Sequence, residues 1–273
     1  MSSLITVFMG GDIYGDPGLR VLEEHFPSLK EREGIDFAVI NGENAANGFG
    51  ILESDAERIF SAGIDVITGG NHTLEKRDVW PFLSTEPRML RPANYPRPGI
   101  PLPPDTYAPG AGFGVFSAAG GSIAVLNLQG RESMTSVDCP FACAEAYLKE
   151  AAGAGAFLLV DFHAESNEEK EALGLFLAGR AAAVCGTHTH VQTADERVLS
   201  GGTAYITDLG MTGPEDSVIG SVVDTAIRRN ITQVPYKMEP SGNEAVIQGV
   251  VIGIDAMSGK AVSIRRVVWP ERG

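Results

Sequence analysis

Short runs of apolar and β-branched residues recur along the chain, and each run ends at a polar, glycine-rich segment. Such runs predict buried β-strands, because strands that are covered on both faces need no polar alternation. The expected strands span residues 4–9, 37–40, 64–68, 123–128, 157–162, 181–184 and 203–207. The first three follow one another at about the spacing of a βαβ unit, roughly 30 residues, which predicts an α/β fold with parallel strands.

Helical patterns with end signals occupy segments between these strands. Residues 52–62 carry acidic side chains near their start and precede Gly63. Asn167 is the expected N-cap of a second helix, and Gly179 is expected to close it. Helices are therefore predicted to alternate with strands.

Two segments depart from this alternation. Apolar runs at 246–254 and 261–269 flank the turn-like residues 257–260, which predicts an antiparallel hairpin and hence a mixed sheet. Half of the 16 prolines fall within residues 87–114, which are therefore expected to form an extended surface excursion, either an inert loop or a wall of the functional site. We assign residues 1–273 to a single domain that includes this excursion.

The composition excludes several classes of protein. Of the 273 residues, 35 are acidic and 21 are basic, for a net charge of −14, and 44% are hydrophobic. These values are typical of a soluble globular protein rather than a disordered or membrane-spanning one. The acidic balance disfavours duplex DNA, whose binding requires Lys and Arg to displace counterions. The first apolar run has no basic region before it, so it predicts a strand rather than a signal peptide, and a cytoplasmic location.

Polar side chains follow the first three predicted strands at the point where each strand ends. They are Asp12 after the first, Glu43 and Asn44 after the second, and Asn71 and His72 after the third. Ligand sites of α/β sheets form at the carboxyl ends of parallel strands. The sequence therefore predicts that carboxylate, amide and imidazole groups meet at one edge of the sheet.

The histidines support this prediction. Four of the five lie at predicted strand ends, at positions 72, 163, 188 and 190. His25, the fifth, lies in a charged segment typical of a solvated helix face. If residues 186–190 are extended, His188 and His190 point to the same side, because side chains alternate along a strand.

Each of these residues has an ordinary structural interpretation when taken alone. Asp12 or Asn71 by itself is more often a helix cap, and a lone histidine is commonly half-buried without binding a ligand. Five strand ends that carry oxygen and nitrogen ligands together favour a metal site instead. The set exceeds what one tetrahedral ion needs, so two metals bridged by a carboxylate fit better, and its donors suit iron, manganese or zinc.

Five motifs are combined in this chain. They are Gly11-Asp12, Asn41-Gly42-Glu43-Asn44, Gly70-Asn71-His72, Asp161-Phe162-His163-Ala164-Glu165 and Gly186-Thr187-His188-Thr189-His190. Together they resemble the calcineurin-like metallophosphoesterases, and more narrowly their YmdB-like branch, bacterial cyclic-nucleotide phosphodiesterases with a dinuclear centre. The resemblance covers nearly the whole chain and implies a four-layer α/β/β/α sandwich of two mixed sheets.

The resemblance also implies roles for the individual residues. Asp12 and His190 would bind the first metal, with Asn44 completing its shell or contacting the phosphate. Glu43 would bridge the two metals. His72 would stand beside the phosphate and donate a proton to the leaving oxygen.

By the same resemblance, Asn71, His163 and His188 would hold the second metal. Two departures from the general superfamily pattern match the YmdB-like branch: Asp12 is not followed by the Asp-x-His histidine, and the bridge is Glu43 where most members have Asp. The first metal shell is then richer in oxygen, so the metal preference of zinc phosphatases does not carry over. We expect two divalent or trivalent ions per chain, with iron favoured and manganese or zinc as alternatives.

The expected reaction is in-line attack on phosphorus by a hydroxide that bridges the metals, with His72 as the proton donor. An alternative role for His72 is to orient Asn71. Asp161 and Asp208 are either orienting residues or strand-end caps. Arg131 either contacts the phosphate or is a surface charge.

The resemblance implies hydrolysis of 2′,3′-cyclic nucleotides or related phosphodiesters, and RNA ends are a further candidate substrate. A phosphomonoesterase is the nearest enzymatic alternative. The alternative from another class is a regulatory protein that binds a phosphorylated ligand with little turnover. A homo-oligomer is compatible with the sequence, and no membrane partner is expected.

Overall fold

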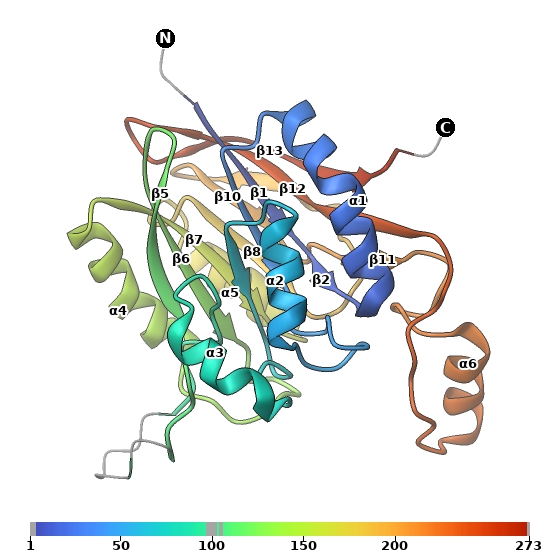
Figure 1. Ribbon diagram of the computed structural model, residues 1–273. Coiled ribbons are helices and arrows are strands. Elements are labelled where there is room, and N and C mark those ends of the chain that lie inside the picture. The colour runs from blue at the N-terminus through green and yellow to red at the C-terminus, as the bar shows by residue number, and fades with distance from the viewer. Residues whose placement is uncertain (1–3, 97–102, 104–105, 272–273) are drawn as a thin grey trace.

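Two β-sheets pack face to face, with helices on both outer sides, in the computed structural model, which describes residues 4–96, 103 and 106–271 (Figure 1). The first sheet contains, in order, β2 (Asp12–Ile13), β11 (Met211–Pro214), β12 (Ala245–Asp255), β1 (Leu4–Gly10), β3 (Phe37–Asn41) and β4 (Val66–Thr68), with β13 (Ala261–Trp269) paired to β12. The second contains, in order, β5 (Phe113–Ala118), β6 (Gly121–Gln129), β7 (Ala156–His163), β8 (Ala183–Thr187), β10 (Thr203–Ile206) and β9 (Arg197–Leu199).

Parallel and antiparallel pairs occur in both sheets. In the first, β1, β3 and β4 are parallel, whereas β12 is antiparallel to β1. In the second, β6, β7 and β8 are parallel, whereas β5 is antiparallel to β6. The prediction of two mixed sheets is therefore confirmed.

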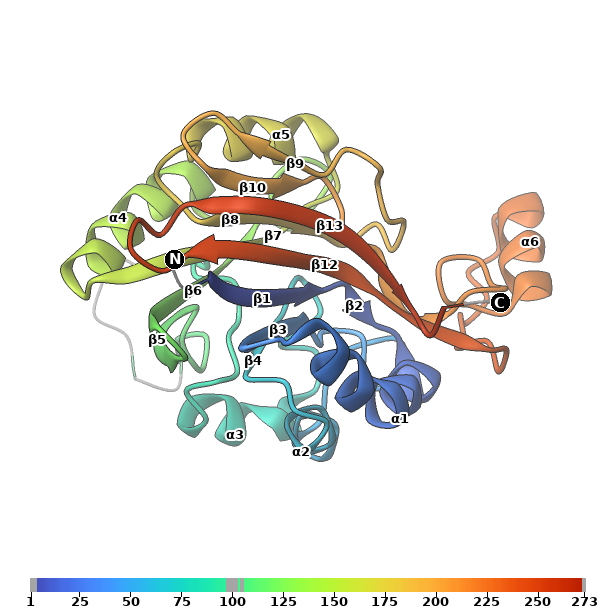
Figure 2. The ribbon, with the colours of Figure 1, turned by 90° about the horizontal axis from the view of Figure 1, so that it is seen from above.

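Helices cover the outer face of each sheet (Figure 2). On the first sheet these are α1 (Gly15–Glu33), α2 (Glu53–Ser61) and α3 (Trp80–Thr85), the last preceded by the short 3₁₀ helix η1 (Arg77–Val79). On the second sheet they are α4 (Pro140–Gly153) and α5 (Asn167–Phe176). The predicted four-layer α/β/β/α sandwich is confirmed. None of the helices in the described ranges is long and apolar enough to cross a bilayer.

Alternation along the strands divides the core into layers. In β1, Val7 and Met9 pack between the two sheets with Leu159 of β7, whereas Phe8 points to the other face and packs against Phe26 of α1. Successive side chains of a strand point to opposite faces, so a strand buried on both sides supplies two apolar layers. This explains why the strand signal in the sequence is a continuous apolar run.

Helix ends differ in part from their prediction. The helix predicted at 52–62 is confirmed as α2. At α5, however, the N-cap is Ser166, because its hydroxyl rather than the Asn167 side chain accepts the N–H of Glu169. That helix ends at Phe176, and Gly179 lies in the following turn at a positive φ of 75°. The predictions of Asn167 as N-cap and Gly179 as helix end are therefore wrong.

The hairpin and the proline-rich excursion were both predicted. β12 and β13 pair in antiparallel register around Gly259, whose φ is 68°, which confirms the hairpin. In the excursion, Met89 and Leu90 form isolated bridges to Ile67 and Ala111. Residues 97–102 and 104–105 of the excursion lie outside the described residues.

The helices that were not predicted include one that lies outside the sandwich. α6 (Val223–Thr232) stands away from the two sheets (Figures 1 and 2). Its Ile227 and Ile231 side chains are exposed. A helix that buries so little of its apolar surface gains little stability from tertiary packing.

Candidate metal centre

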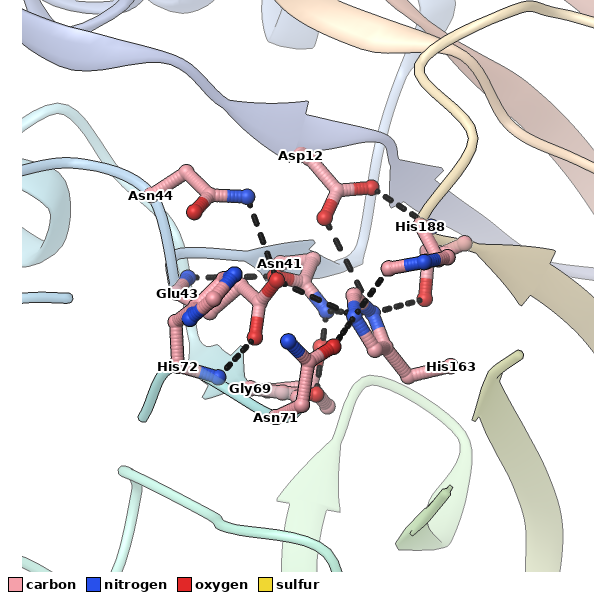
Figure 3. Close-up of polar contacts among 12 residues, drawn as sticks. Asp12, Asn41, Glu43, Asn44, Gly69, Asn71, His72, His163 and His188 are labelled. Carbon is pink, nitrogen blue, oxygen red and sulfur yellow. Dashed lines mark hydrogen bonds and ion pairs between the residues drawn. The ribbon is translucent and has the colours of Figure 1, made fainter. Parts of the chain in front are cut away.

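The predicted site residues come from the carboxyl ends of strands in both sheets (Figure 3). They are Asp12 in β2, Glu43 and Asn44 after β3, Asn71 and His72 after β4, His163 at the end of β7, and His188 and His190 after β8. The structure brings these eight residues to one place. Asp12 does not cap α1, whose N-cap is Tyr14, and Asn71 does not cap the next helix, whose N-cap is Lys76.

Three potential ligand atoms surround Nε2 of His163. It lies 3.0 Å from Oε1 of Glu43, 3.1 Å from Oδ1 of Asn71 and 3.0 Å from Nδ1 of His188 (Figure 3). A single proton on Nε2 can be directed at only one of these atoms, whereas a cation among them would meet a lone pair from each of the four residues. Oxygen and imidazole donors of this kind suit a first-row transition metal. The donor set therefore fits a metal ion.

A second group of donors adjoins the first. Oδ1 of Asp12 is buried and has no hydrogen-bond partner among the described residues, and it lies 3.9 Å from Nε2 of His190. Nδ2 of Asn44 lies 3.3 Å from the same nitrogen. His190 donates from Nδ1 to the carbonyl of Ile219 at 2.9 Å, which leaves the lone pair of Nε2 facing Asp12. A cation would satisfy the orphaned carboxylate oxygen.

Glu43 connects the two groups. Its Oε1 contacts His163 and accepts from Nδ2 of Asn44 at 3.1 Å, and its Oε2 accepts the backbone N–H of His72 at 2.9 Å. Gly70 makes room for this carboxylate. A β-carbon at position 70 would lie 2.3 Å from Nε2 of His163 and 2.4 Å from Oε2 of Glu43. This is the position that a bridging carboxylate would need.

The charges in the cluster shift one another's pKa values. Burial opposes a charged imidazole at His163, yet the negative charges of Glu43 and Asp12 raise its pKa to about 9. Burial would raise the pKa of Glu43, but the charge of His163 and its hydrogen bond lower it overall. Burial and the charge of His163 lower the pKa of His188 to about 3, and burial raises the pKa of Asp12 to about 6. Metal-free protein therefore holds a proton on His163 at neutral pH.

We expect metal binding to release about one proton per chain at neutral pH, because His163 must lose its proton to offer Nε2 as a ligand. The apparent affinity for Mn²⁺ should then rise about tenfold per pH unit and level off near the His163 pKa of about 9. Calorimetric titration of chelator-treated protein, in buffers of differing ionisation enthalpy, counts the protons. Binding without proton release would contradict this assignment.

His72 lies at the rim of the cluster. Its imidazole is 30% exposed and packs against the ring of Phe49, with centroids 4.3 Å apart. Its Nδ1 has no hydrogen-bond partner among the described residues and lies 3.7 Å from the carboxylate of Glu75. A half-buried imidazole whose Nδ1 has no hydrogen-bond partner among the described residues suits a group that meets a substrate better than a metal ligand.

The extended conformation predicted for residues 186–190 is wrong. β8 ends at Thr187, and His188 and His190 have φ values of 103° and 63°. Left-handed conformations cost roughly 1–2 kcal/mol per residue and persist only where neighbours hold them. Here Oδ2 of Asp12 accepts the N–H of His188 at 3.1 Å. Both imidazoles nevertheless reach the cluster.

Asp161 lies directly behind His163. It accepts the hydroxyl of Thr187 at 2.6 Å, the amide of Asn41 at 3.2 Å and the hydroxyl of Thr68. Because Thr187 donates its only hydrogen to Asp161, its oxygen accepts from Nδ1 of His163 at 3.0 Å, and Nε2 is left to face the cluster. The geometry favours Asp161 as an orienting residue, and Thr187 and Asn41 are partners that were not predicted.

Glu165 is a further residue that was not predicted. Its Oε2 lies 3.0 Å from Nε2 of His188, so Nδ1 of that imidazole faces the cluster. Metal-binding histidines commonly pair their other ring nitrogen with a carboxylate or a carbonyl. The available signal was the position of Glu165 in the motif, two residues after His163.

Two other predictions concern the surroundings of the site. Arg131 is exposed, and its backbone N–H binds the carboxylate of Glu169, so no phosphate role is assigned to it. Tyr95, in the described part of the excursion, has its pKa raised first by burial and then by the negative charge of Glu43. The choice between an inert loop and a wall of the site stays a prediction.

The two mixed sheets, their outer helices and the cluster at their shared edge define a metallophosphoesterase fold. The chain belongs to the YmdB-like protein family, whose model matches residues 8–267. The predicted fold and family are thus confirmed.

Individual relatives match over nearly their whole length. A 2′,3′-cyclic-nucleotide 2′-phosphodiesterase of Bacillus subtilis is 43% identical over 258 residues, 94% of each chain. A putative phosphatase/phosphodiesterase of Mycoplasma genitalium is 32% identical, over 96% of this chain and 92% of that protein. Among solved structures, a hypothetical protein from Thermus thermophilus has a TM-score of 0.88 and 36% identity, covering 98% of this chain and 100% of that one. A novel phosphatase from Mycoplasma pneumoniae has a TM-score of 0.87 and 30% identity, covering 98% and 95%.

Proposed function

We propose that the protein is a metal-dependent phosphodiesterase that hydrolyses 2′,3′-cyclic nucleotides or related phosphodiesters. The coarser activity, hydrolysis of a phosphoric ester, follows from membership of a family whose relatives carry the names phosphodiesterase and phosphatase. The observation that supports the finer proposal is the convergence of Glu43, Asn71 and His188 on Nε2 of His163, with Asp12 and His190 beside them.

Two metal ions would fit this arrangement, with iron favoured and manganese or zinc as alternatives. Asn71, His163 and His188 would hold one ion, Asp12 and His190 the other, with Asn44 beside it and Glu43 shared. Such ions supply Lewis acidity toward phosphoryl oxygens and lower the pKa of water. The chain carries a net charge of −14, so local positive charge at the site would also offset the repulsion of an anionic substrate.

The chain's own residues would supply orientation and a proton. Nδ2 of Asn44 lies next to His190 and Glu43, where an amide can donate to a phosphoryl oxygen. The imidazole of His72 at the rim is placed to donate a proton to the departing alkoxide, a role typically worth 10²–10⁴-fold in rate. The proline-rich excursion, if it forms a wall of the site, would border the substrate on one side.

We expect the metal-loaded protein to turn over 2′,3′-cyclic AMP and bis-p-nitrophenyl phosphate faster than the monoester p-nitrophenyl phosphate. Metal chelation should abolish all three activities. The eight site residues include no lysine or arginine whose positive charge could replace that of the metals at the phosphate. Parallel assays on one preparation, together with elemental analysis after loading with iron, manganese or zinc, test both points. Faster monoester hydrolysis would contradict the diesterase assignment.

Two alternatives are tested by the same assays. A phosphomonoesterase is one alternative, because the Mycoplasma genitalium relative carries the name phosphatase/phosphodiesterase. A regulatory protein that binds a phosphorylated ligand would bind metal and ligand without turnover. RNA ending in a 2′,3′-cyclic phosphate is a further candidate substrate, and its hydrolysis can be measured alongside the mononucleotide.

A further inference from the structure

A lysine is buried behind the metal-binding turn. Lys170, on α5, is 1% exposed, and its Nζ donates to Oδ2 of Asp208 at 2.7 Å. Asp208 is also fully buried. Lysine is almost never fully buried unless it is paired, because its ammonium group loses hydration. The loss of hydration makes a buried ion pair costly, so its contacts with neighbouring residues indicate what the pair holds in place.

Asp208 gathers several donors around that lysine. Its Oδ2 also accepts the backbone N–H and the hydroxyl of Thr189, at 3.1 and 2.8 Å, and its Oδ1 accepts the N–H of Gly210 at 2.9 Å. Thr189 lies between His188 and His190, the two residues with left-handed backbones. The ion pair therefore links α5 to the middle of the turn that presents both imidazoles.

The lysine side chain passes close to the end of β8. A β-carbon at Gly186 would lie 2.8 Å from Cδ of Lys170 and 1.8 Å from the carbonyl oxygen of Thr207. Only glycine leaves this space open. The motif that ends in His188 and His190 thus begins with a residue that accommodates the lysine behind it.

We propose that Lys170 is a positioning residue of the metal centre: through Asp208 and Thr189 it fixes the left-handed turn that directs His188 and His190 toward the cations. This proposal rests on the metal site of the proposed function. The ammonium group fixes Oδ2 of Asp208 by its short contact, and the two carboxylate oxygens accept from Thr189 and Gly210. Without Lys170, the carboxylate that accepts from Thr189 would lose the contact to α5 that holds it in place.

The test uses metal binding, not activity. Lys170→Met keeps the length of the side chain and removes its charge. Titration of chelator-treated protein with Mn²⁺ should show at least about a tenfold loss of affinity, since outer partners of metal ligands typically contribute 10–100-fold. Lys30→Met is the matched control, because Lys30 also pairs with an aspartate, Asp65 at 3.6 Å, among residues that contact no predicted ligand.

A second variant separates positioning from folding. Lys170→Met combined with Asp208→Asn leaves no buried unpaired charge, so its thermal unfolding without metal should return toward that of the wild type. Its Mn²⁺ affinity should stay weak, because the single amide oxygen cannot replace a carboxylate whose two oxygens accept from four donors. Wild-type affinity in either variant would overturn the positioning role, whereas a wild-type protein that binds no metal would overturn the proposed function instead.

Discussion

Replacement of Glu43 by alanine is expected to abolish paired metal binding and to lower kcat/KM for a phosphodiester at least about 10³-fold. Glu43 is the residue whose carboxylate contacts both donor groups, through His163 and Asn44. Metal ions contribute several kcal/mol to such reactions, and each 1.36 kcal/mol is about tenfold in rate. Elemental analysis and steady-state kinetics on one preparation measure both effects.

Glu57→Ala is the matched control for this variant, because Glu57 is an exposed glutamate of α2. It should bind metal and turn over substrate as the wild type does. Thermal unfolding of both proteins separates loss of the ligand from loss of the fold. Two ions per chain in folded Glu43→Ala protein would show that Glu43 is not the bridge.

Substitution of His72 by alanine should lower kcat for 2′,3′-cyclic AMP by about 10²–10⁴-fold and leave the metal content unchanged. The alkoxide that leaves from ribose needs a proton, whereas nitrophenolate leaves without one. The loss should therefore be much smaller for bis-p-nitrophenyl phosphate. The position of the imidazole at the rim, packed on Phe49 and without a partner for Nδ1 among the described residues, is the structural reason to expect this split.

His25→Ala provides the comparison, since His25 lies on α1 beside Glu24. It should leave both rates unchanged. Equal losses on the two substrates in His72→Ala would point to orientation of Asn71 rather than proton donation. Full retention of activity would remove any chemical role for His72.

The elements that were predicted correctly share one property, namely that their signal is local. β3 is a run of apolar and β-branched residues buried on both faces, and β12 and β13 flank a turn around Gly259. The candidate ligands were recognisable for the same reason, because Glu43 and Asn71 directly follow strands whose ends meet at one edge. A motif of a few residues is enough to identify a candidate ligand where it follows a strand whose end lies at the site.

The features that were missed depend on tertiary contacts. The left-handed turn at His188 is held by Asp12, which is 176 positions away in the sequence. Lys170 lies in a helix rich in charged residues, where a solvated lysine is the ordinary interpretation, and only the fold places it against Asp208. The choice of Ser166 over Asn167 as N-cap is a shift of one residue, within the usual uncertainty of helix ends.

Some expectations concern properties beyond the contacts described above. The assignment of residues 1–273 to one domain, the cytoplasmic location, the exclusion of duplex DNA and the compatibility with a homo-oligomer stay predictions. So do the roles of the eight site residues as ligands and proton donor, which the variants proposed above address.

The placement of the cluster between the two sheets connects metal binding to the stability of the fold. Asp12 lies in a strand of the first sheet and Glu43 and Asn71 follow strands of it, whereas His163 ends a strand of the second sheet and His188 follows one. Metal ions held between these residues would link the two sheets of the sandwich. Their binding free energy would then contribute to the global free energy of unfolding rather than only to the opening of a single loop. The same ions that serve catalysis would therefore stabilise the whole fold.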